Sequence, residues 1–423
     1  MACDTLIGHL TYGQSVARGD DQIRRYFIFR AVTSFSMWLP FWTLWAYRNL
    51  DEDMFLLTVV DSAFWITMIV FQVPAGLIGD KYGRKPVLFI GEAVYAVGLL
   101  AFGFSTEFWM LVGANAIWAV GVCFIVSGDT PFLYDTLLEN GRQGEFIKIA
   151  ARQWTVQATM GAAACVVGGV LVEVVAPERF DLTLKISALI GLVGCFAILL
   201  VREPKVDREH FVSYTKQLRE GMRRVLSSHA IQILILLQIV IEIAVYVMVV
   251  FRSVYMDENL NLDSLQLGVF IGAFTIFGGI AAFQAGKIED LLGEKRTLVF
   301  LFLAVILSFV VVFLVSHPAV IFIQFLIYSV SALQAPIISG YINKRVDSPH
   351  RSTVVAIATL LFTLVLTVVE LGSGWVAEKA GLTTSLLVLA LAASPIGLFL
   401  LILWNREVDK SKKSEALRLE RQI

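Results

Sequence analysis

Six ionisable side chains lie in stretches of the sequence that are otherwise apolar, and they are the residues most able to do chemistry there: Arg30, Asp61, Glu92, Asp129, Glu242 and Glu370. A charge is costly inside an apolar segment, so each one marks a proton, ion or substrate pathway unless a neighbour satisfies it. The sequence offers no set of His, Cys and carboxylate residues with metal-ligand spacing and no nucleophile beside a matching base. We therefore expect neither a metal, another cofactor nor an enzymatic activity.

Two of these acids, Glu242 and Glu370, are flanked by apolar residues on both sides. Burial among apolar groups favours the protonated carboxyl, which makes both candidates for proton coupling. The alternative is that each forms a hydrogen bond with a neighbouring helix, or that Glu370 meets Arg252. Four further side chains are candidates to line a solute cavity: Asp61, Gln72, Trp118 and Gln334.

The elements that position these residues are predicted to be membrane-spanning helices. Of the 423 residues, 57% are hydrophobic and only 16% are charged, whereas charged residues make up about a quarter of a soluble domain. A helix needs about 20 mostly apolar residues to cross a bilayer. The sequence contains twelve such stretches, at residues 26–47, 55–79, 86–104, 108–129, 154–174, 182–201, 230–251, 265–285, 297–315, 319–341, 353–376 and 385–404. The predicted fold class is an all-α membrane protein.

One long polar interruption, from Arg202 to His229, divides the stretches six and six. It predicts an N-terminal six-helix bundle over residues 1–201, a linker over 202–229, a C-terminal six-helix bundle over 230–404 and a tail over 405–423. Within the linker, apolar residues recur at steps of three and four, which is typical of an amphipathic helix: Phe211, Tyr214, Leu218, Met222 and Leu226.

Most of the 34 Lys and Arg residues fall in the N-terminal segment, the linker, the tail and alternate loops. Because basic residues resist translocation, this distribution predicts that both termini face the cytoplasm, in a plasma or inner membrane. The first 25 residues are polar and mixed in charge, so no removable signal peptide is expected.

The loop between the second and third stretches has a distinctive spacing, and its notable residues are Gly76, Asp80, Lys81, Gly83, Arg84 and Lys85. A weaker copy occurs 210 positions later, with Asp290 in the place of Asp80, Gly293 in that of Gly83 and Lys295 in that of Lys85. Both copies follow the second stretch of their half. The repeat predicts two pseudo-symmetric bundles related by an axis along the membrane normal.

Together these features resemble the major facilitator superfamily of transporters, in a prokaryotic form. The segments that end the fourth and tenth stretches, Ser127–Leu137 and Tyr341–Arg345, are also similar to that family. The resemblance implies that the loop is a conformational latch for an outward-open state, with Asp80 near residues 351–353 and Asp290 near residues 152–155. The alternative is a loop that only anchors topology through its basic residues.

The resemblance also implies that the first and fourth stretches line a cavity, which would bring Arg30 to Asp129, with Asp135 beyond it. Such a pair is either a fixed structural bridge or a gate that opens when a proton or an anionic substrate competes for Arg30. The third stretch is peripheral in this family, so Glu92 is expected to be structural.

The fifth stretch partly resembles the glycine-proline motif of drug/proton antiporters in the same family. It departs from that motif at Ala164 and Cys165, where the family has glycine and proline. Close helix packing through the remaining small residues is therefore the favoured interpretation.

The predicted function is secondary active transport of a small organic solute by alternating access, with proton-coupled export as the leading hypothesis. Uptake by symport or facilitated diffusion is the alternative within transport, and a non-transporting receptor or scaffold is the alternative from another class. No phosphate-binding loop supports ATP-driven pumping, and nothing indicates a nucleic-acid partner. The expected partners are the solute, protons and the lipid bilayer, with the protein acting as a monomer.

Overall fold

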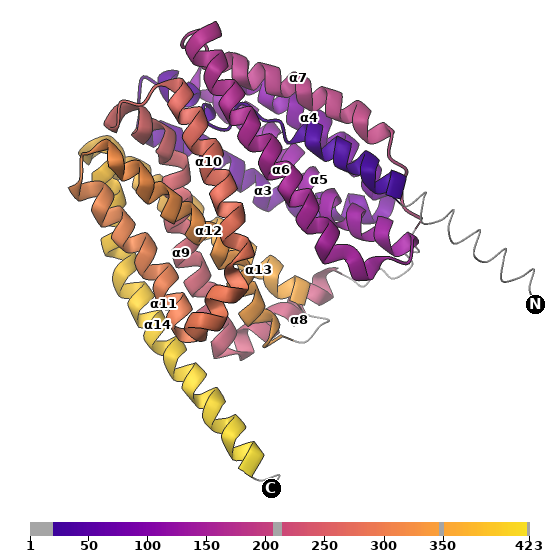
Figure 1. The fold of residues 1–423 in the computed structure, drawn as a ribbon, viewed down its shortest axis with the longest axis vertical. Helices are drawn as coiled ribbons and strands as arrows, with labels where there is room; N and C mark the ends of the chain where they lie inside the picture. The colour runs from indigo at the N-terminus through magenta and orange to yellow at the C-terminus, as the bar shows by residue number, and fades with distance from the viewer. Residues whose placement is uncertain (1–19, 206–213, 347–350, 421–423) are drawn as a thin grey trace, which may run out of the picture. The chain divides into compact units, whose positions relative to one another are not determined.

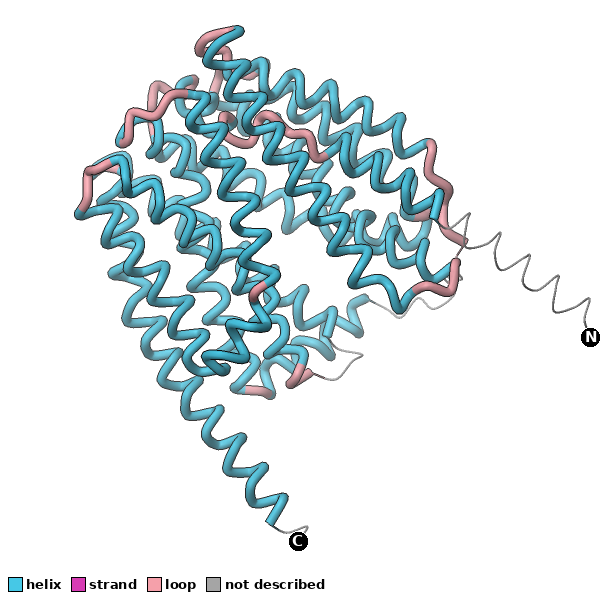
Figure 2. Tube along the Cα trace, viewed as in Figure 1, coloured by secondary structure: helices cyan, strands magenta, loops and turns pink. Residues whose placement is uncertain are grey.

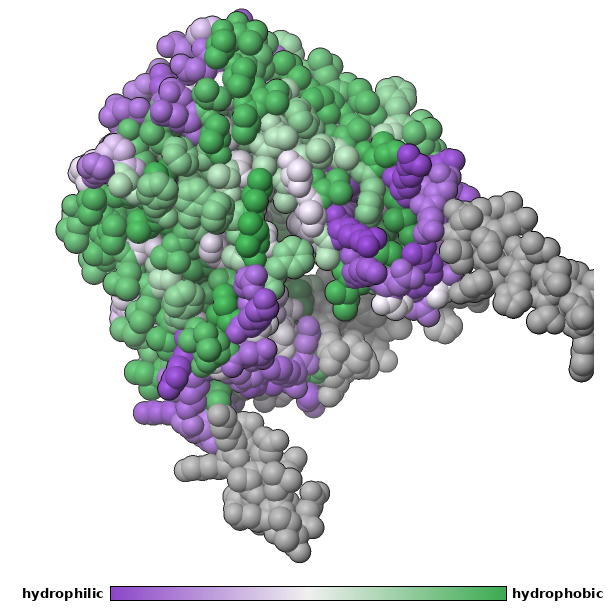
Figure 3. All heavy atoms as spheres, viewed as in Figure 1, coloured by the Kyte–Doolittle hydropathy of each residue, from purple (hydrophilic) through white to green (hydrophobic). Residues whose placement is uncertain are grey.

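The computed structural model describes residues 20–205, 214–346 and 351–420, and the regular elements among them are all helical (Figures 1 and 2). Eleven of these helices are long and apolar enough to cross a membrane. Many of their large apolar side chains are exposed, as a lipid-facing surface requires. On the face drawn in Figure 3, apolar residues predominate and polar residues gather in patches at the top left, the right and the bottom. The predicted all-helical membrane class is confirmed.

The first predicted span, residues 26–47, is not one continuous helix, and this part of the prediction is wrong. The chain is helical over residues 20–33, turns, and resumes as α2 (Trp42–Arg48). Pro40 lies in the turn, where its ring removes a backbone donor and disfavours a helical residue before it. Hydropathy shows only that a segment is apolar, so it did not reveal this break.

The described residues form two compact units, of which unit one comprises residues 20–52, 59–205 and 263–272. Its helices after α2 are most of α3 (Met54–Tyr82), α4 (Arg84–Phe104), α5 (Phe108–Glu139), α6 (Phe146–Val170) and α7 (Phe180–Leu199). Helix α4 packs against both α5 and α7. The α4–α5 approach is close, because a Cβ at Gly91 would lie 2.9 Å from the backbone nitrogen of Ile125.

Among the described residues, unit two comprises 53–58, 214–262, 273–346 and 351–420. Its helices are α8 (Tyr214–Ser227), α9 (His229–Val254), most of α10 (Ser264–Phe283), α11 (Ala285–Leu314), α12 (Ile321–Asn343), α13 (Arg351–Ala380) and α14 (Leu382–Glu420). Helix α9 contacts α11, α12, α13 and α14 and is the most buried span. Helix α8 lies where the linker predicts an amphipathic helix, although Phe211 is outside the described residues. The predicted domain boundaries stay a prediction.

Each unit also contains the start of one helix from the other half of the sequence. The first turn of α3 belongs to unit two, where the Met54 amide donates to Glu378 Oε2 at 3.0 Å. The start of α10 belongs to unit one, where the Ser264 amide donates to Glu173 Oε2, also at 3.0 Å. A carboxylate at this position satisfies a free helical N–H and complements the positive end of the helix dipole.

Close packing also holds the start of α10 in unit one. A Cβ added at Gly169 of α6 would lie 2.8 Å from the Ser264 carbonyl oxygen, and one at Gly272 would lie 2.9 Å from the Ala162 carbonyl oxygen. The small residues of the fifth predicted span therefore pack against another helix, as expected for a segment that departs from the antiporter motif.

Candidate functional site

A buried ion cluster in unit one brings together residues from four helices. Arg30 Nε lies 3.3 Å from Asp129 Oδ1, so the predicted pair is in contact. The Tyr26 hydroxyl donates to the same Oδ1, and Gln153 Nε2 donates to Asp129 Oδ2 at 3.0 Å. With its amide oxygen toward Arg30, Gln157 accepts hydrogen bonds of 2.9 Å from both Nε and Nη2.

Helical spacing explains why these side chains converge. Tyr26 and Arg30 are four residues apart on the helix over residues 20–33, and Gln153 and Gln157 are four apart on α6, so each pair shares one helix face. The Tyr26 ring stacks on Phe132 of α5 with the ring centroids 5.3 Å apart. That contact lies one turn beyond Asp129 and aligns the two helices.

A third charge in the cluster is Glu92 of α4, whose contact with Arg30 the sequence does not predict. Glu92 Oε1 lies 3.7 Å from Arg30 Nη1, and the residue is 1% exposed. The peripheral position that the family resemblance implied for its helix suggested a structural role. The sequence does contain a signal for a charged contact. Glu92 is a single carboxylate in an apolar helix, and such a group needs a charged partner.

The cluster therefore holds one guanidinium between two carboxylates, surrounded by a phenol and two amides. Removing one partner of a buried ion pair lowers the stability of the fold much more than removing one partner of an exposed pair, because the remaining buried charge has no counter-ion. Its members are all side chains that can exchange a proton or rearrange hydrogen bonds. Chemically, it can bind a proton, or bind a charged solute in exchange for one of its own ion pairs.

Asp135, predicted to extend this cluster, instead belongs to the loop region of unit one. Its Oδ2 lies 3.7 Å from Arg84 Nε, and Arg84 Nη2 also lies 2.5 Å from Asp80 Oδ1. The Glu203 carboxylate accepts hydrogen bonds from the backbone amides of Arg84 and Lys85, at 2.8 and 2.6 Å. Gly83 has φ of 107°, a conformation that strongly favours glycine.

In the second copy of the loop, a glycine again interrupts the helical backbone, since Gly293 has φ of 71° within α11. Asp290, however, is exposed, and no salt bridge to it occurs among the described residues. Glu294 forms an ion pair in this copy, with its Oε2 at 2.9 Å from Arg345 Nη2. The latch roles of Asp80 and Asp290 stay predictions.

The two predicted proton-coupling acids both lie in unit two. Glu242 of α9 accepts a hydrogen bond from Gln238 Nε2 at 3.1 Å, one helical turn away. Glu370 of α13 is fully buried. Arg252, the proposed alternative partner of Glu370, has its guanidinium 5.2 Å from the centre of the Tyr328 ring.

The predicted cavity residues differ in their local surroundings. Trp118 lies in an aromatic cluster at the core of unit one, in contact with five other rings: Trp38, Trp42, Phe64, Tyr95 and Phe102. Asp61 accepts a hydrogen bond from Trp65 Nε1 at 3.2 Å on the same helix. Gln334 of α12 is buried, and Gln72 of α3 is half-buried. The assignment of these four residues to a solute cavity stays a prediction.

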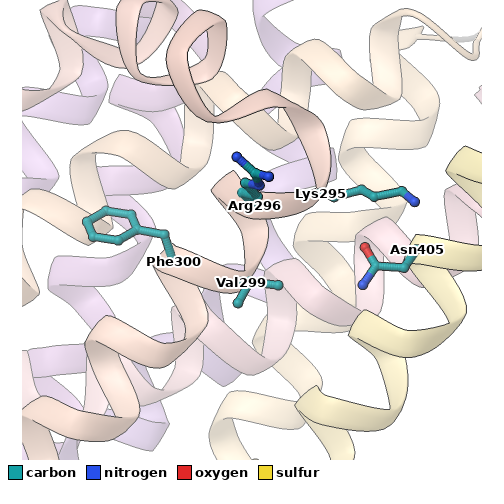
Figure 4. Close-up of a pocket in the computed structure, with 5 residues that line it drawn as sticks. All are labelled: Lys295, Arg296, Val299, Phe300 and Asn405. Atoms are coloured by element: carbon teal, nitrogen blue, oxygen red, sulfur yellow. The ribbon is translucent and has the colours of Figure 1, made fainter.

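Two cavities of about 400 and 420 Å³ lie in unit two. The first is lined by Lys295, Arg296, Val299, Phe300 and Asn405, and none of these was a predicted cavity residue. Figure 4 shows the Lys295 and Arg296 side chains pointing in different directions, so they do not converge on one ligand position. Within the described part of the chain, no group of three or more His, Cys, Asp and Glu residues could hold a metal ion.

Known proteins are similar to this chain over most of its length. The structure of the nucleoside transporter NupG is 14% identical, with a TM-score of 0.74, and the alignment covers 90% of this chain and 99% of that one. The class H tetracycline resistance protein of Pasteurella multocida is 26% identical over 67% of this chain and 70% of its own length. The inner membrane transport protein YajR of Escherichia coli is 29% identical over 25% of this chain, a match that spans only 23% of that relative.

The structural likeness shows that this chain shares the fold of NupG. The sequence relatives include a transport protein. A model of the Major Facilitator Superfamily matches residues 26–255 and 234–422. These two ranges cover both predicted halves from residue 26 onward, and they include the buried ion cluster and both copies of the loop. The chain therefore belongs to the Major Facilitator Superfamily of membrane transporters.

Proposed function

We propose that this transporter exports a small organic solute by alternating access, in exchange for protons. The observation that carries the proposal is the buried cluster of Arg30, Asp129 and Glu92 in unit one. Ionisable groups at such depth in a span are expensive to keep and typically mark a proton or substrate pathway. A guanidinium shared between two carboxylates is a suitable group for coupling, because one added proton changes its pairing.

Export is favoured over uptake by the sequence relatives. The tetracycline resistance protein matches two thirds of this chain, and its name describes protection against a drug. The nucleoside transporter is 14% identical, so its likeness supports the fold and not the cargo. Uptake by symport and facilitated diffusion remain the alternatives that a flux measurement must separate.

In this proposal the Arg30–Asp129 pair is the gate, and the acids Glu242 and Glu370 of unit two are additional proton carriers. The loop around Asp80 biases the conformational equilibrium. Both termini face the cytoplasm, since most basic residues outside the spans lie in segments on that side. The protein works as a monomer in the cell membrane.

The direct test is flux in proteoliposomes with and without a pH gradient, using tetracycline, ethidium and uridine as probes. The proposal expects the gradient to drive at least one probe, and expects Arg30→Gln to abolish that flux. Flux that ignores the gradient would support facilitated diffusion, and movement of uridine alone would support a nucleoside carrier. No flux of any probe would favour a receptor or scaffold.

The loop has its own test. Asp80→Asn is expected to shift the balance between inward-open and outward-open states, measured by the accessibility of single introduced cysteines from each side of the membrane. Asp290→Asn tests the latch role of the second copy by the same measurement. An unchanged balance in Asp80→Asn would leave topology anchoring as the role of the loop.

A further inference from the structure

We propose that Glu92 is the proton-binding carboxyl of the buried cluster, and that its proton determines which carboxylate Arg30 pairs with. The proton occupancy of Glu92 follows from the geometry of unit one alone. Only its use in coupling rests on the proposed transport function.

The first step is a count of charge in the cluster. One guanidinium, on Arg30, faces two carboxylates, on Asp129 and Glu92. If both carboxylates were ionised, the buried group would carry a net negative charge. A buried carboxylate without full compensation costs several kcal/mol, on the order of its desolvation penalty, and normally takes up a proton instead. One of the two acids is therefore protonated.

Asp129 and Glu92 differ in the groups that contact them. Asp129 has the nearer contact with Arg30, at 3.3 Å, and accepts hydrogen bonds from Tyr26 and Gln153. These donors stabilise its ionised form. Glu92 has a single charged contact, at 3.7 Å, which is too long for a hydrogen bond. Its Oε1 is buried and has no hydrogen-bond partner among the described residues. Glu92 is thus the acid that holds the proton.

The titratable and charged groups near Glu92 come from four helices, its own included. Arg30 reaches it from the helix over residues 20–33 and Asp129 from α5. Tyr95 lies on its own helix, α4, and Cys195 on α7. Only Arg30 among these groups is a cation. At 1% exposure Glu92 is closed to water in this conformation, so its proton exchanges only when the cluster opens.

The fourth step is the exchange itself. On opening, the O–H bond of the Glu92 carboxyl breaks and the proton passes to water, which leaves a carboxylate and a hydronium ion. Arg30 is then attracted by two carboxylates instead of one, and its contact with Asp129 weakens. Tyr26 and Gln153 still hold Asp129 in place. The Arg30 side chain is therefore the group that moves, and its hydrogen bonds to Gln157 break as it does so.

A spectroscopic test does not require a known substrate. Infrared difference spectra of the purified protein at neutral pH should contain the C=O stretch of a protonated carboxylic acid that disappears in Glu92→Gln and persists in Asp129→Asn. Raising the pH should remove the same band from the wild-type spectrum. Loss of a carboxylate band in Glu92→Gln, or loss of the acid band in Asp129→Asn instead, would overturn the proposal.

A transport test separates this inference from the proposed function. In proteoliposomes, Glu92→Gln should lower gradient-driven flux of an active probe by about tenfold, within the range typical of coupled sites, while exchange without a gradient continues. If Glu92→Gln removes the infrared band but neither the wild type nor the variant shows gradient-driven flux, the proton site stands and the transport proposal fails. If wild-type flux is gradient-driven and Glu92→Gln matches it, the coupling role of Glu92 is refuted.

Discussion

The two halves of the chain place an ion pair at equivalent positions but with the charges exchanged. In the first half, Arg84 of the loop faces Asp135 at the end of α5. In the second half, Glu294 faces Arg345 after α12, and each of these residues lies 210 positions after its counterpart. The repeat therefore preserves the location of the pair and not its polarity. A contact between opposite charges has the same energy whichever side carries the cation.

The buried cluster shows the opposite behaviour, because only one half has it. The positions 210 residues after Arg30, Glu92 and Asp129 are Val240, Phe302 and Ser339. Phe302 is buried in unit two. The duplicated charges pair at the same place in each half, which fits a role in the architecture of each bundle. The unduplicated cluster has no such counterpart, which fits the coupling role proposed for it.

The largest expected effect is the loss of the unduplicated cation. Arg30→Met leaves Asp129 buried without its counter-ion, and breaking a buried pair in this way costs about 3 to 5 kcal/mol. The free energy of unfolding in detergent, measured by denaturant titration, should fall by that amount. Val240→Met, at the equivalent position of the second half, is the control and should change it much less. Equal losses would remove the distinction between the halves.

A smaller effect is expected from the charge-exchanged pair. Arg345→Asp places like charges beside each other at Glu294 and should destabilise the protein by about 1 to 2 kcal/mol, since the pair is partly exposed. Adding Glu294→Arg restores the pair in the polarity of the first half. The double variant should recover at least half of the loss, although Arg345 also packs over Trp404 at 4.8 Å. Additive losses would show that polarity matters.

The smallest loss of stability is expected at the start of α3, which belongs to unit two, and at the start of α10, which belongs to unit one. Glu173→Gln and Glu378→Gln each weaken one cap by about 0.5 to 1 kcal/mol, because the amide keeps an acceptor but loses the charge. Amide hydrogen exchange at Ser264 should accelerate in the first variant and exchange at Met54 in the second. Similar changes would support symmetric caps, while an effect in one variant alone would make the caps another difference between the halves.

Much of the fold follows from local sequence properties. Long apolar segments predict the helices and their number to within one, because backbone hydrogen bonding and burial of apolar area act along each segment. The polar linker and the repeated loop predict the two halves and the family. The interruption of the first span at Pro40 was visible as a proline, but hydropathy averages over such residues. Asp290 was selected because it repeats Asp80, yet the acids of its loop that form ion pairs are Glu289 and Glu294.

The sequence by itself determined the class of the protein, the pairing of Arg30 with Asp129 by family resemblance, and the rarity of charges inside the spans. Only the tertiary structure decided that Glu92 joins them, that Asp135 belongs to Arg84, and that Trp118 is part of an aromatic core. The physical reason is that position along a helix does not state which face a residue occupies. Charge pairing depends on a few ångströms between helices, and those distances are set by packing.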